Sequence, residues 1–565
     1  MNDQAGIPQY DVAILGTGIA GTMLGAIFAR QGKKVLMIEK EVHPRFALGE
    51  SMILESSEMM RLTAERFGVP EIGYISTIQT TIREITSQCG VKKNFSFMYH
   101  RPGEPQKAPE ITQIPIPKIP YGHELHMFRQ DIDAYMMAAA VKYGADIRQR
   151  VDVTDVDFHA DGAVLTTSRG EKFGAKFVAD AGGYRSMLAT KFDLRPKPLM
   201  AKTHSRALFT HFVGVRPFHT YGHKLKDQGV PSALHEGTLH HIFHGGWFWI
   251  IPFNNHPNAT NPLCSVGINL DTRMHPRPKG DPYEEFLYWI NRYPSITPQF
   301  EEAKPVRDWV STDRIQYATT QVVGDRWCLM GHAAGAVDAL FSRGMFHTTA
   351  TVHAVADQVL EALADNNFSR ARFQHIEDTV QTGLRYNDRT VACSYASFCN
   401  FDMWNAWYRV YGLGAFLEAL RLIRAHLKYV ETGDAEFLRV LHHTPFRTLG
   451  GGLEGYDELW HTACETVESV EANRISPQEA TKTIYGLFAK ADFIPPDLDI
   501  TNPNRRFLSE ANPAGVLKLI WWGKTGAPKY IKERFFDISV ATLLSEKAKW
   551  SERNLKRTPP RAYAG

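Results

Sequence analysis

A glycine-rich turn between two apolar runs constrains the fold of this chain more than any other stretch. Residues 12–15 (VAIL) predict a short buried strand, residues 20–30 a helix, and residues 34–38 a second strand. The turn GTGIAG, residues 16–21, has the spacing G-x-G-x-x-G. In such a turn the glycines permit a tight bend, close approach of a pyrophosphate, and packing of the helix on the strand. The unit predicts a dinucleotide-binding βαβ fold.

The second predicted strand ends in an acidic residue, as a ribose-binding strand does. Glu39 lies eighteen positions after the last glycine, and its carboxylate can accept hydrogen bonds from a ribose. The helix N-terminus supplies free N–H groups for phosphates. The loop HPRFALGES, residues 43–51, follows this strand and can lie along the cofactor. The cofactor contacts expected from this region are Gly16, Gly18, Ile19, Ala20, Gly21, Glu39, Lys40, Arg45, Gly49, Glu50 and Ser51.

Bulk properties exclude several classes of protein. A chain of 565 residues is long enough for two or more folding units. A net charge of +3 does not indicate binding to nucleic acid. No apolar run reaches the roughly 18 residues that a membrane span needs. The N-terminus shows no signal peptide, and the six cysteines are scattered without a C-x-x-C pair. We therefore expect a cytoplasmic protein that binds neither nucleic acid nor membrane.

Three later stretches favour a flavin over a nicotinamide. Arg129, at the start of a predicted helix, can offer a positive charge to the pyrophosphate. Asp180-Ala181-Gly182 closes an apolar strand, where small residues let the chain pass close to a cofactor. Asp325 precedes the strand WCLMG and can reach a ribose or ribitol hydroxyl, and residues 331–335 are expected to open a helix aimed at the flavin ring. Asp325 and Gly335 therefore join the expected cofactor contacts.

This order of motifs resembles the FAD-dependent aromatic hydroxylase superfamily over residues 10–365. The resemblance implies a mixed α/β (α+β) fold of the glutathione-reductase type, with an inserted β-sheet substrate layer. We assign residues 1–365 to the FAD-binding module, with substrate-layer segments at about 75–125 and 195–310, and residues 366–565 to a helical region that covers the substrate. Within the layer, residues 80–100 predict strands, and the proline-rich residues 102–120 predict a surface loop.

One strand distinguishes this chain within that superfamily. Residues 247–252 read W-x-W-x-I-P, and alternating aromatics of this kind also fill ordinary cores. The string resembles the signature of flavin-dependent halogenases. The resemblance implies that Trp247 and Trp249 keep substrate from the flavin hydroperoxide, which oxidises chloride or bromide to hypohalous acid. The acid then passes through a tunnel to the substrate.

The resemblance also implies a lysine in that tunnel. Lys92 and Lys93 are adjacent on a predicted strand, so their side chains point to opposite faces and one can enter the interior. Cys89-Gly90-Val91-Lys92 is similar to a C-G-x-K segment of the halogenases that act on phenols, which favours Lys92 as the catalytic residue. A buried lysine loses its charge easily, which suits transfer of a halogen.

The halide site implied by the resemblance is Ser342, Arg343 and Gly344, in the string DALFSRG. Backbone N–H groups in such a turn can bind an anion. Tryptophan-specific relatives carry a glutamate just before this serine. Phe341 occupies that position here, which argues against tryptophan as the substrate. The residues expected along the substrate channel are Trp247, Trp249, Pro252, Phe95 and Phe341.

The sequence thus predicts an FADH2-dependent halogenase of a small electron-rich phenol. A separate NAD(P)H-dependent flavin reductase would supply FADH2, because no second nucleotide motif is present. Two alternatives stay open at this point: an FAD-dependent aromatic hydroxylase, and a non-catalytic flavoprotein. No metal site is expected, because His240, His241 and His244 have no carboxylate at a fixed spacing.

Overall fold

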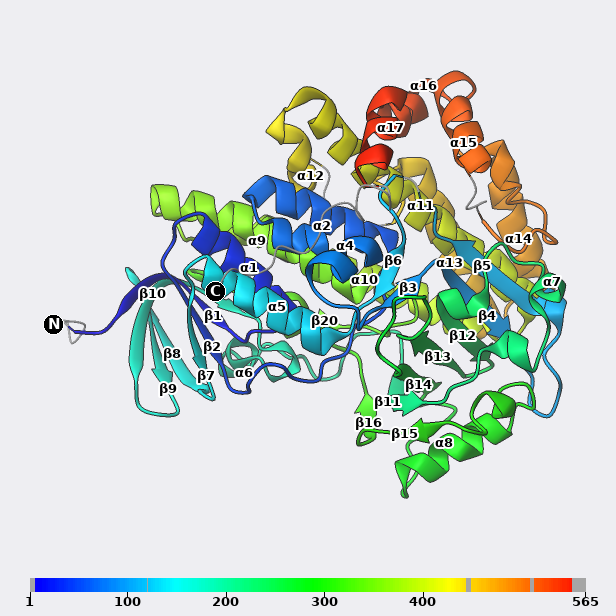
Figure 1. The fold of residues 1–565 in the computed structure, drawn as a ribbon, viewed down its shortest axis with the longest axis horizontal. Coiled ribbons are helices and arrows are strands. Elements are labelled where there is room, and N and C mark those ends of the chain that lie inside the picture. Colours follow the sequence, from blue (N-terminus) through cyan, green and yellow to red (C-terminus); the bar gives the residue numbers. More distant parts are fainter. Residues whose placement is uncertain (1–5, 119, 444–448, 509–512, 551–565) are drawn as a thin grey trace.

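A mostly parallel sheet forms one end of the computed structural model, which describes residues 6–118, 120–443, 449–508 and 513–550 (Figure 1). The order of its main strands is β18-β19-β10-β1-β2-β7, and β9 and β8 extend it as a hairpin from β10. The five strands β7, β2, β1, β10 and β19 run parallel, so their carboxyl ends share one edge. The strands are β1 (Gln9–Leu15), β2 (Val35–Glu39), β7 (Asp146–Gln149), β8 (Val153–His159), β9 (Gly162–Thr167), β10 (Lys172–Asp180), β18 (Val323–Gly324) and β19 (Trp327–Leu329).

Helices cover this sheet and confirm the predicted βαβ unit. Helix α1 (Ile19–Arg30) begins within the glycine turn, directly after Gly18, and packs against α5 (Arg129–Lys142) and α9 (Gly344–Asp365). Helix α2 (Leu54–Phe67) packs against α9. The central strands β1, β2, β10 and β19 are mostly buried, which explains their apolar runs.

The second sheet forms the other end of the molecule, as expected for the inserted layer. Its order is β15-β11-β14-β13-β12-β4-β5, and β16 also pairs with β11. Because alternate residues point to opposite faces, Trp247 and Trp249 of β13 join a core with α10 and α11, whereas Phe248 joins a core with α8. The elements are β4 (Asn94–Tyr99), β5 (Ile111–Pro115), β11 (Ser205–Val213), β12 (Thr238–Phe243), β13 (Gly246–Pro252), β14 (Cys264–Asp271), α8 (Pro282–Asn291), β15 (Lys304–Pro305) and β16 (Val310–Arg314).

Two local predictions in this layer are wrong. Residues 80–86 were expected to be a strand, but α4 (Ile78–Glu84) is a helix whose N-cap, Thr77, accepts a hydrogen bond from the backbone N–H of Thr80. The proline-rich stretch 102–120 contains β5, which pairs with β4 at the edge of the sheet. An edge strand tolerates Pro115 because only one of its sides needs hydrogen-bond donors.

Several short elements lie outside the two large sheets. Strand β3 pairs with β6, and β17 pairs with β20. These elements are α3 (Pro70–Tyr74), β3 (Gly90–Lys92), β6 (Glu124–His126), α6 (Met187–Lys191), α7 (Leu225–Gln228), β17 (Tyr317–Ala318) and β20 (Gly335–Ala336).

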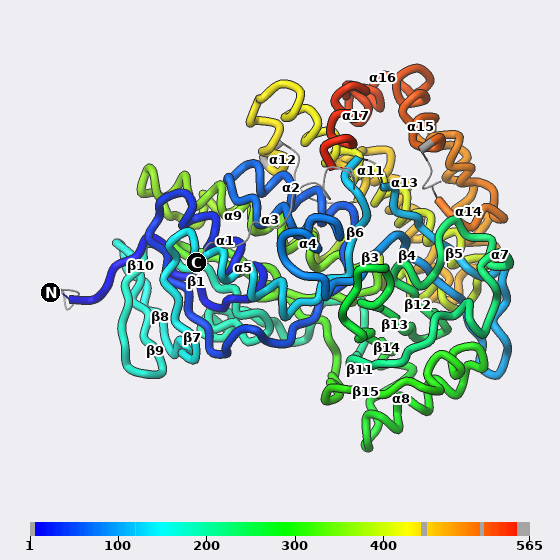
Figure 2. The backbone as a smooth tube through the Cα atoms, viewed as in Figure 1, coloured from blue at the N-terminus to red at the C-terminus, as the bar shows by residue number. Residues whose placement is uncertain are grey.

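Beyond residue 365 the described chain is helical, as predicted. In Figure 2 the helices from α10 onward can be followed from the first sheet to the second, where α13, α14 and α15 gather. None of the helices in the described ranges has the length and apolarity needed to cross a bilayer. The helices are α10 (Arg370–Ser397), α11 (Phe401–Thr432), α12 (Val440–His443), α13 (Glu454–Glu471), α14 (Pro477–Lys490), α15 (Pro513–Thr525), α16 (Lys529–Ile531) and α17 (Val540–Lys549), with a π turn at Lys532–Phe536.

Candidate functional site

A cavity of about 430 Å³ lies at the carboxyl ends of β1, β2 and β10. A Cβ added to Gly16 (φ +93°) would lie 2.8 Å from the carbonyl oxygen of Ala181, and one added to Gly21 would lie 2.1 Å from that of Gly16. At Gly18 the same atom would meet only Nη2 of Arg45, at 3.6 Å. The turn is therefore closed where strand and helix pack and open where a pyrophosphate would approach, so these residues fit a dinucleotide such as FAD. Predicted residues that line the cavity are Gly16, Glu39, Lys40, Arg45, Asp180, Ala181 and Gly182.

Glu39 is a buried carboxylate that also holds the glycine turn. Its Oε2 accepts hydrogen bonds from N–H and Oγ1 of Thr17, both at 2.9 Å, and Nη2 of Arg45 lies 3.5 Å away. Burial alone would raise the pKa of Glu39, but backbone N–H groups and Arg45 lower it below its usual range. The ionised carboxylate therefore lies at the end of β2, where a ribose would lie.

Two further predicted residues, Asp180 and Arg129, hold the backbone of loops around the cavity by hydrogen bonds. Asp180 accepts hydrogen bonds from N–H of Gly182 at 2.9 Å and from Oγ of Ser186 at 2.7 Å, so it shapes the turn after β10. Arg129 forms a bidentate ion pair with Asp133 and donates to the carbonyl of Leu48. Its charge is thus balanced within the protein, and it fixes the 48–49 loop rather than offering an unpaired charge to a pyrophosphate.

Two cofactor predictions are wrong in placement. Asp325 lies in the tight turn before β19, at the amino end of that strand, and accepts a hydrogen bond from N–H of Arg370 at 2.6 Å. The nucleotide cavity is at the opposite, carboxyl edge of the sheet. Gly335 pairs in β20 instead of opening a helix, and the helix expected there, α9, begins at Gly344.

Lys92 is fully buried and Lys93 is not, as strand alternation predicted. Nζ of Lys92 donates to Oγ of Ser51 at 2.8 Å and to the carbonyl of Met52 at 2.6 Å, and it lies 4.2 Å from the ring centroid of Phe95. Nζ of Lys93 pairs with Glu236 at 2.7 Å near the surface. Burial lowers the pKa of Lys92 to about 7, although Glu124 and Glu55 oppose that shift. Lys92 can therefore be ammonium or free amine near neutral pH.

The end of the loop 43–51, Gly49-Glu50-Ser51 (the GES loop), connects Lys92 to the rest of the site. Oγ of Ser51 is 2.8 Å from Oγ1 of Thr238, which in turn lies 3.0 Å from Nε2 of His126. Nδ1 of His126 donates to the carbonyl of Pro252 at 2.8 Å, which links this chain of hydrogen bonds to the end of the W-x-W-x-I-P strand. Glu50, the neighbour of Ser51, accepts a hydrogen bond from Nε2 of His211 at 2.8 Å.

The predicted halide residues form the turn that leads into helix α9. Ser342 has φ +54°, in the left-handed region, and Arg343 has φ −79° and ψ −9°, in the right-handed helical region. The backbone N–H of Ser342 donates to the carbonyl of Ala339 at 2.8 Å, and Gly344 then begins the 22-residue helix α9. No side chain caps the helix start. The turn has the backbone geometry and the helix dipole to hold a halide.

A buried carboxylate that sequence reasoning missed joins this turn to Lys92. Oε1 of Glu55, on the first turn of α2, lies 3.0 Å from Nη1 of Arg343. Burial raises the pKa of Glu55, whereas Arg343 opposes the shift. Acidic residues in a first helical turn are commonly solvated, so nothing local in the sequence marks this one as buried. The charge of the Arg343 side chain is thus balanced by a buried carboxylate.

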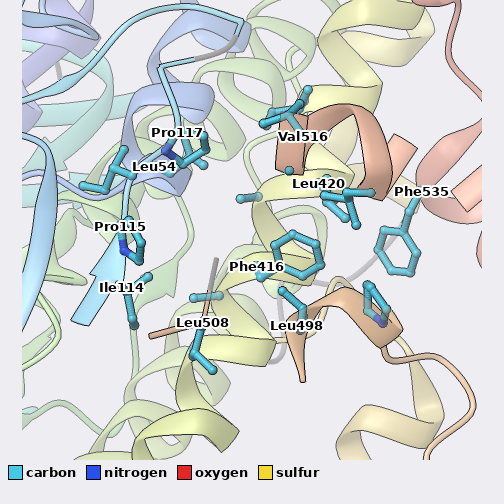
Figure 3. Close-up of a pocket in the computed structure, with 18 of the residues that line it drawn as sticks. Leu54, Ile114, Pro115, Pro117, Phe416, Leu420, Leu498, Leu508, Val516 and Phe535 are labelled. Carbon is cyan, nitrogen blue, oxygen red and sulfur yellow. The ribbon is translucent and has the colours of Figure 1, made fainter. Parts of the chain in front are cut away.

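Lys92 and Glu55 line a second cavity, of about 260 Å³, whose walls are mostly apolar (Figure 3). It shares no lining residue with the nucleotide cavity. Of the five residues predicted for the substrate channel, only Phe95 lines it. The other four are not among its lining residues. Phe341 stacks at 3.7 Å behind Tyr411, which does line it, and Pro252 borders a different small cavity.

The two tryptophans belong to the same buried core as Phe95 and Tyr411 and are held by hydrogen bonds. Nε1 of Trp247 donates to the hydroxyl of Tyr395 at 3.1 Å, and that hydroxyl donates to Asp338 at 2.9 Å. Nε1 of Trp249 donates to Oγ of Ser265 at 3.2 Å. Burial raises the pKa of Asp338 to about 6. Asp338 was not among the predicted site residues, although it begins the string DALFSRG, four residues before Ser342.

This fold defines an FAD-binding protein with a second, apolar cavity. The profile of the FAD binding domain family matches residues 9–345. The chain is 43% identical to the monodechloroaminopyrrolnitrin halogenase PrnC of Pseudomonas fluorescens, over 93% of this chain and 94% of that protein. It is 40% identical to the tetracycline 7-halogenase of Kitasatospora aureofaciens, over 88% and 90%.

Solved structures agree with these relatives. The crystal structure of halogenase PltM in complex with phloroglucinol and FAD superposes with a TM-score of 0.85 at 34% identity, covering 88% of this chain and 99% of PltM. The chain belongs to the flavin-dependent halogenases, enzymes that use FAD. Since these relatives are all named halogenases, the aromatic hydroxylase alternative is disfavoured.

Proposed function

We propose that this enzyme halogenates an electron-rich phenol and that Lys92 carries the electrophilic halogen to the ring. The observation that carries the proposal is the position of Lys92: fully buried, with a pKa lowered to about 7, on the wall of an apolar cavity separate from the nucleotide cavity. The phenol is supported by Phe341 in place of glutamate and by PltM, whose crystal structure contains phloroglucinol.

Reduced FAD, when bound, supplies with O2 the two-electron oxidation that converts chloride or bromide to hypohalous acid. In this proposal the turn Ser342-Arg343-Gly344 holds the halide. Trp247 and Trp249 keep the phenol apart from the halide and the flavin. The amine of Lys92 either hydrogen-bonds hypohalous acid or exchanges a proton for halogen with release of water. The ring then takes the halogen, and the ring proton returns to the amine or leaves in water.

The remaining assignments belong to the same proposal. Residues 1–365 would bind FAD, and residues 366–565 would cover the substrate. A separate NAD(P)H-dependent flavin reductase would supply FADH2 in the cytoplasm. All six cysteines are free thiols, which suits a reducing compartment.

The test uses the purified enzyme with a flavin reductase, FAD, NADH, O2, a halide salt and a panel of phenols, with products read by mass spectrometry. We expect Lys92→Ala to bind FAD normally but to lose halogenated product by about 100-fold or more, as expected when a covalent or acid–base residue is removed. Lys93→Ala, on the opposite face, is the matched control and should keep its product.

Two results would contradict the proposal. Undiminished halogenation by Lys92→Ala would remove Lys92 from the mechanism. A hydroxylated product that forms equally well without halide would make the enzyme an aromatic hydroxylase.

A further inference from the structure

We infer that the substrate carries a second apolar group beyond its reacting ring, and that the C-terminal helices bind this group. The inference rests on the proposed function and refines it from phenols in general to phenols with two rings or with a comparable apolar substituent. It follows from the chemistry of the cavity, its size, and the chain segments that build it.

The chemical groups of the cavity lie in different regions. Lys92 and Glu55 are both buried and supply polar atoms to the wall near the GES loop. Asp497 and Lys518, also among the lining residues, are exposed and mark the part of the wall next to solvent. A phenol hydroxyl therefore finds hydrogen-bond partners near Lys92, and the intervening wall offers contacts mainly to hydrocarbon.

Apolar side chains from distant parts of the chain form this wall. Figure 3 shows Leu54, Ile114 and Pro115 on one side and Phe416, Leu498 and Phe535 across from them. Such a surface gains free energy from removing hydrocarbon from water, and Arg424 and Arg505 are its remaining charged lining residues.

The size of the cavity exceeds the need of one ring. A closed apolar cavity of about 150 Å³ is enough to bind benzene. The cavity here is about 260 Å³, so a single phenol ring would leave much of the apolar wall without contacts.

The far wall comes from lining residues between Pro495 and Leu543, within the C-terminal region that was expected to cover the substrate. Helix α15 contributes Val516, and the π turn before α17 contributes Phe535. These residues lie more than 400 positions after Lys92 in sequence and complete the same cavity. They are therefore placed to select the substituent of the phenol rather than its reactive carbon.

The test compares resorcinol with 5-phenylresorcinol, which share the same two activating hydroxyls. We expect kcat/KM for halogenation to be at least about tenfold higher for 5-phenylresorcinol, the ratio that burial of part of a ring supports. Val516→Trp fills the far part of the cavity and should bring this ratio close to one. Leu517→Trp introduces the same residue at an exposed neighbour on α15 and should leave the ratio unchanged.

The outcomes separate this inference from the proposed function. If neither phenol is halogenated, the proposed function fails. If both are halogenated but resorcinol is as good a substrate as 5-phenylresorcinol, the inference alone is overturned. A ratio that persists in Val516→Trp, with the folded protein verified by its FAD absorbance and thermal melt, would also overturn it.

Discussion

The two cavities of this enzyme are built in opposite ways. The nucleotide cavity is lined by four short stretches at the edge of one parallel sheet, and backbone geometry at Gly16, Gly18 and Gly21 shapes the turn beside it. The apolar cavity is lined by side chains from α2, β3, β5, α11, α15 and the π turn. Backbone-shaped sites are thus encoded locally, and side-chain cavities only by the tertiary fold.

The sharpest test of that contrast is Gly18→Leu. Gly18 has ordinary extended backbone angles and open space at its Cβ position, so the substitution should leave the fold intact. It should nevertheless raise the Kd for FAD by about 100-fold or more, because the side chain would occupy the pyrophosphate position. Fluorescence titration of the FAD-free protein measures the affinity, and a thermal melt reports the fold.

Gly21→Ala is the matched comparison. Its Cβ would lie 2.1 Å from a backbone oxygen, so this smaller change should unfold the βαβ unit rather than only empty the site. If Gly18→Leu bound FAD with unchanged affinity, the pyrophosphate would not lie over this turn.

The same contrast explains what the sequence predicted. The βαβ unit, the opposite faces of Lys92 and Lys93, and the sheet layer follow from spacing and strand periodicity, which act over a few residues. Glu55 was missed because its burial depends on α9 and α11, far along the chain. Asp325 was misplaced because a Gly-Asp pair looks the same at either end of a strand. Residues 80–86 alternate like a strand, but the cap at Thr77 and the packing around it favour a helix.

The buried amine allows a second test, in which stability replaces activity. The native state loses the proton of Lys92 at about pH 7, whereas an unfolded lysine keeps it until about pH 10.4. Between these values the unfolded state binds more protons, so the free energy of unfolding rises with pH by up to about 1.4 kcal/mol per unit. Lys92→Met should lose this contribution.

Urea unfolding of both proteins at pH 7.5, 8.5 and 9.5 measures the difference in slope. Lys93→Met, whose side chain is partly exposed, should keep the slope of the unsubstituted enzyme. Equal slopes for Lys92→Met and the unsubstituted enzyme would show that burial does not lower the pKa of Lys92. The wall of the apolar cavity would then contain no amine that loses its proton near neutral pH.

The smallest effect is expected at Ser342. Halide binding by the serine hydroxyl and halide binding by backbone N–H groups predict different changes in the KM for halide when Ser342 is replaced. If the halide is held by backbone N–H groups, Ser342→Gly should change the KM for chloride or bromide by less than about threefold, because glycine keeps the left-handed φ of +54°. Stability should change by no more than about 1 kcal/mol. Ser342→Val, which resists this φ, should raise the halide KM by distorting the turn. A tenfold rise in KM for the glycine variant would instead assign the halide contact to the serine hydroxyl.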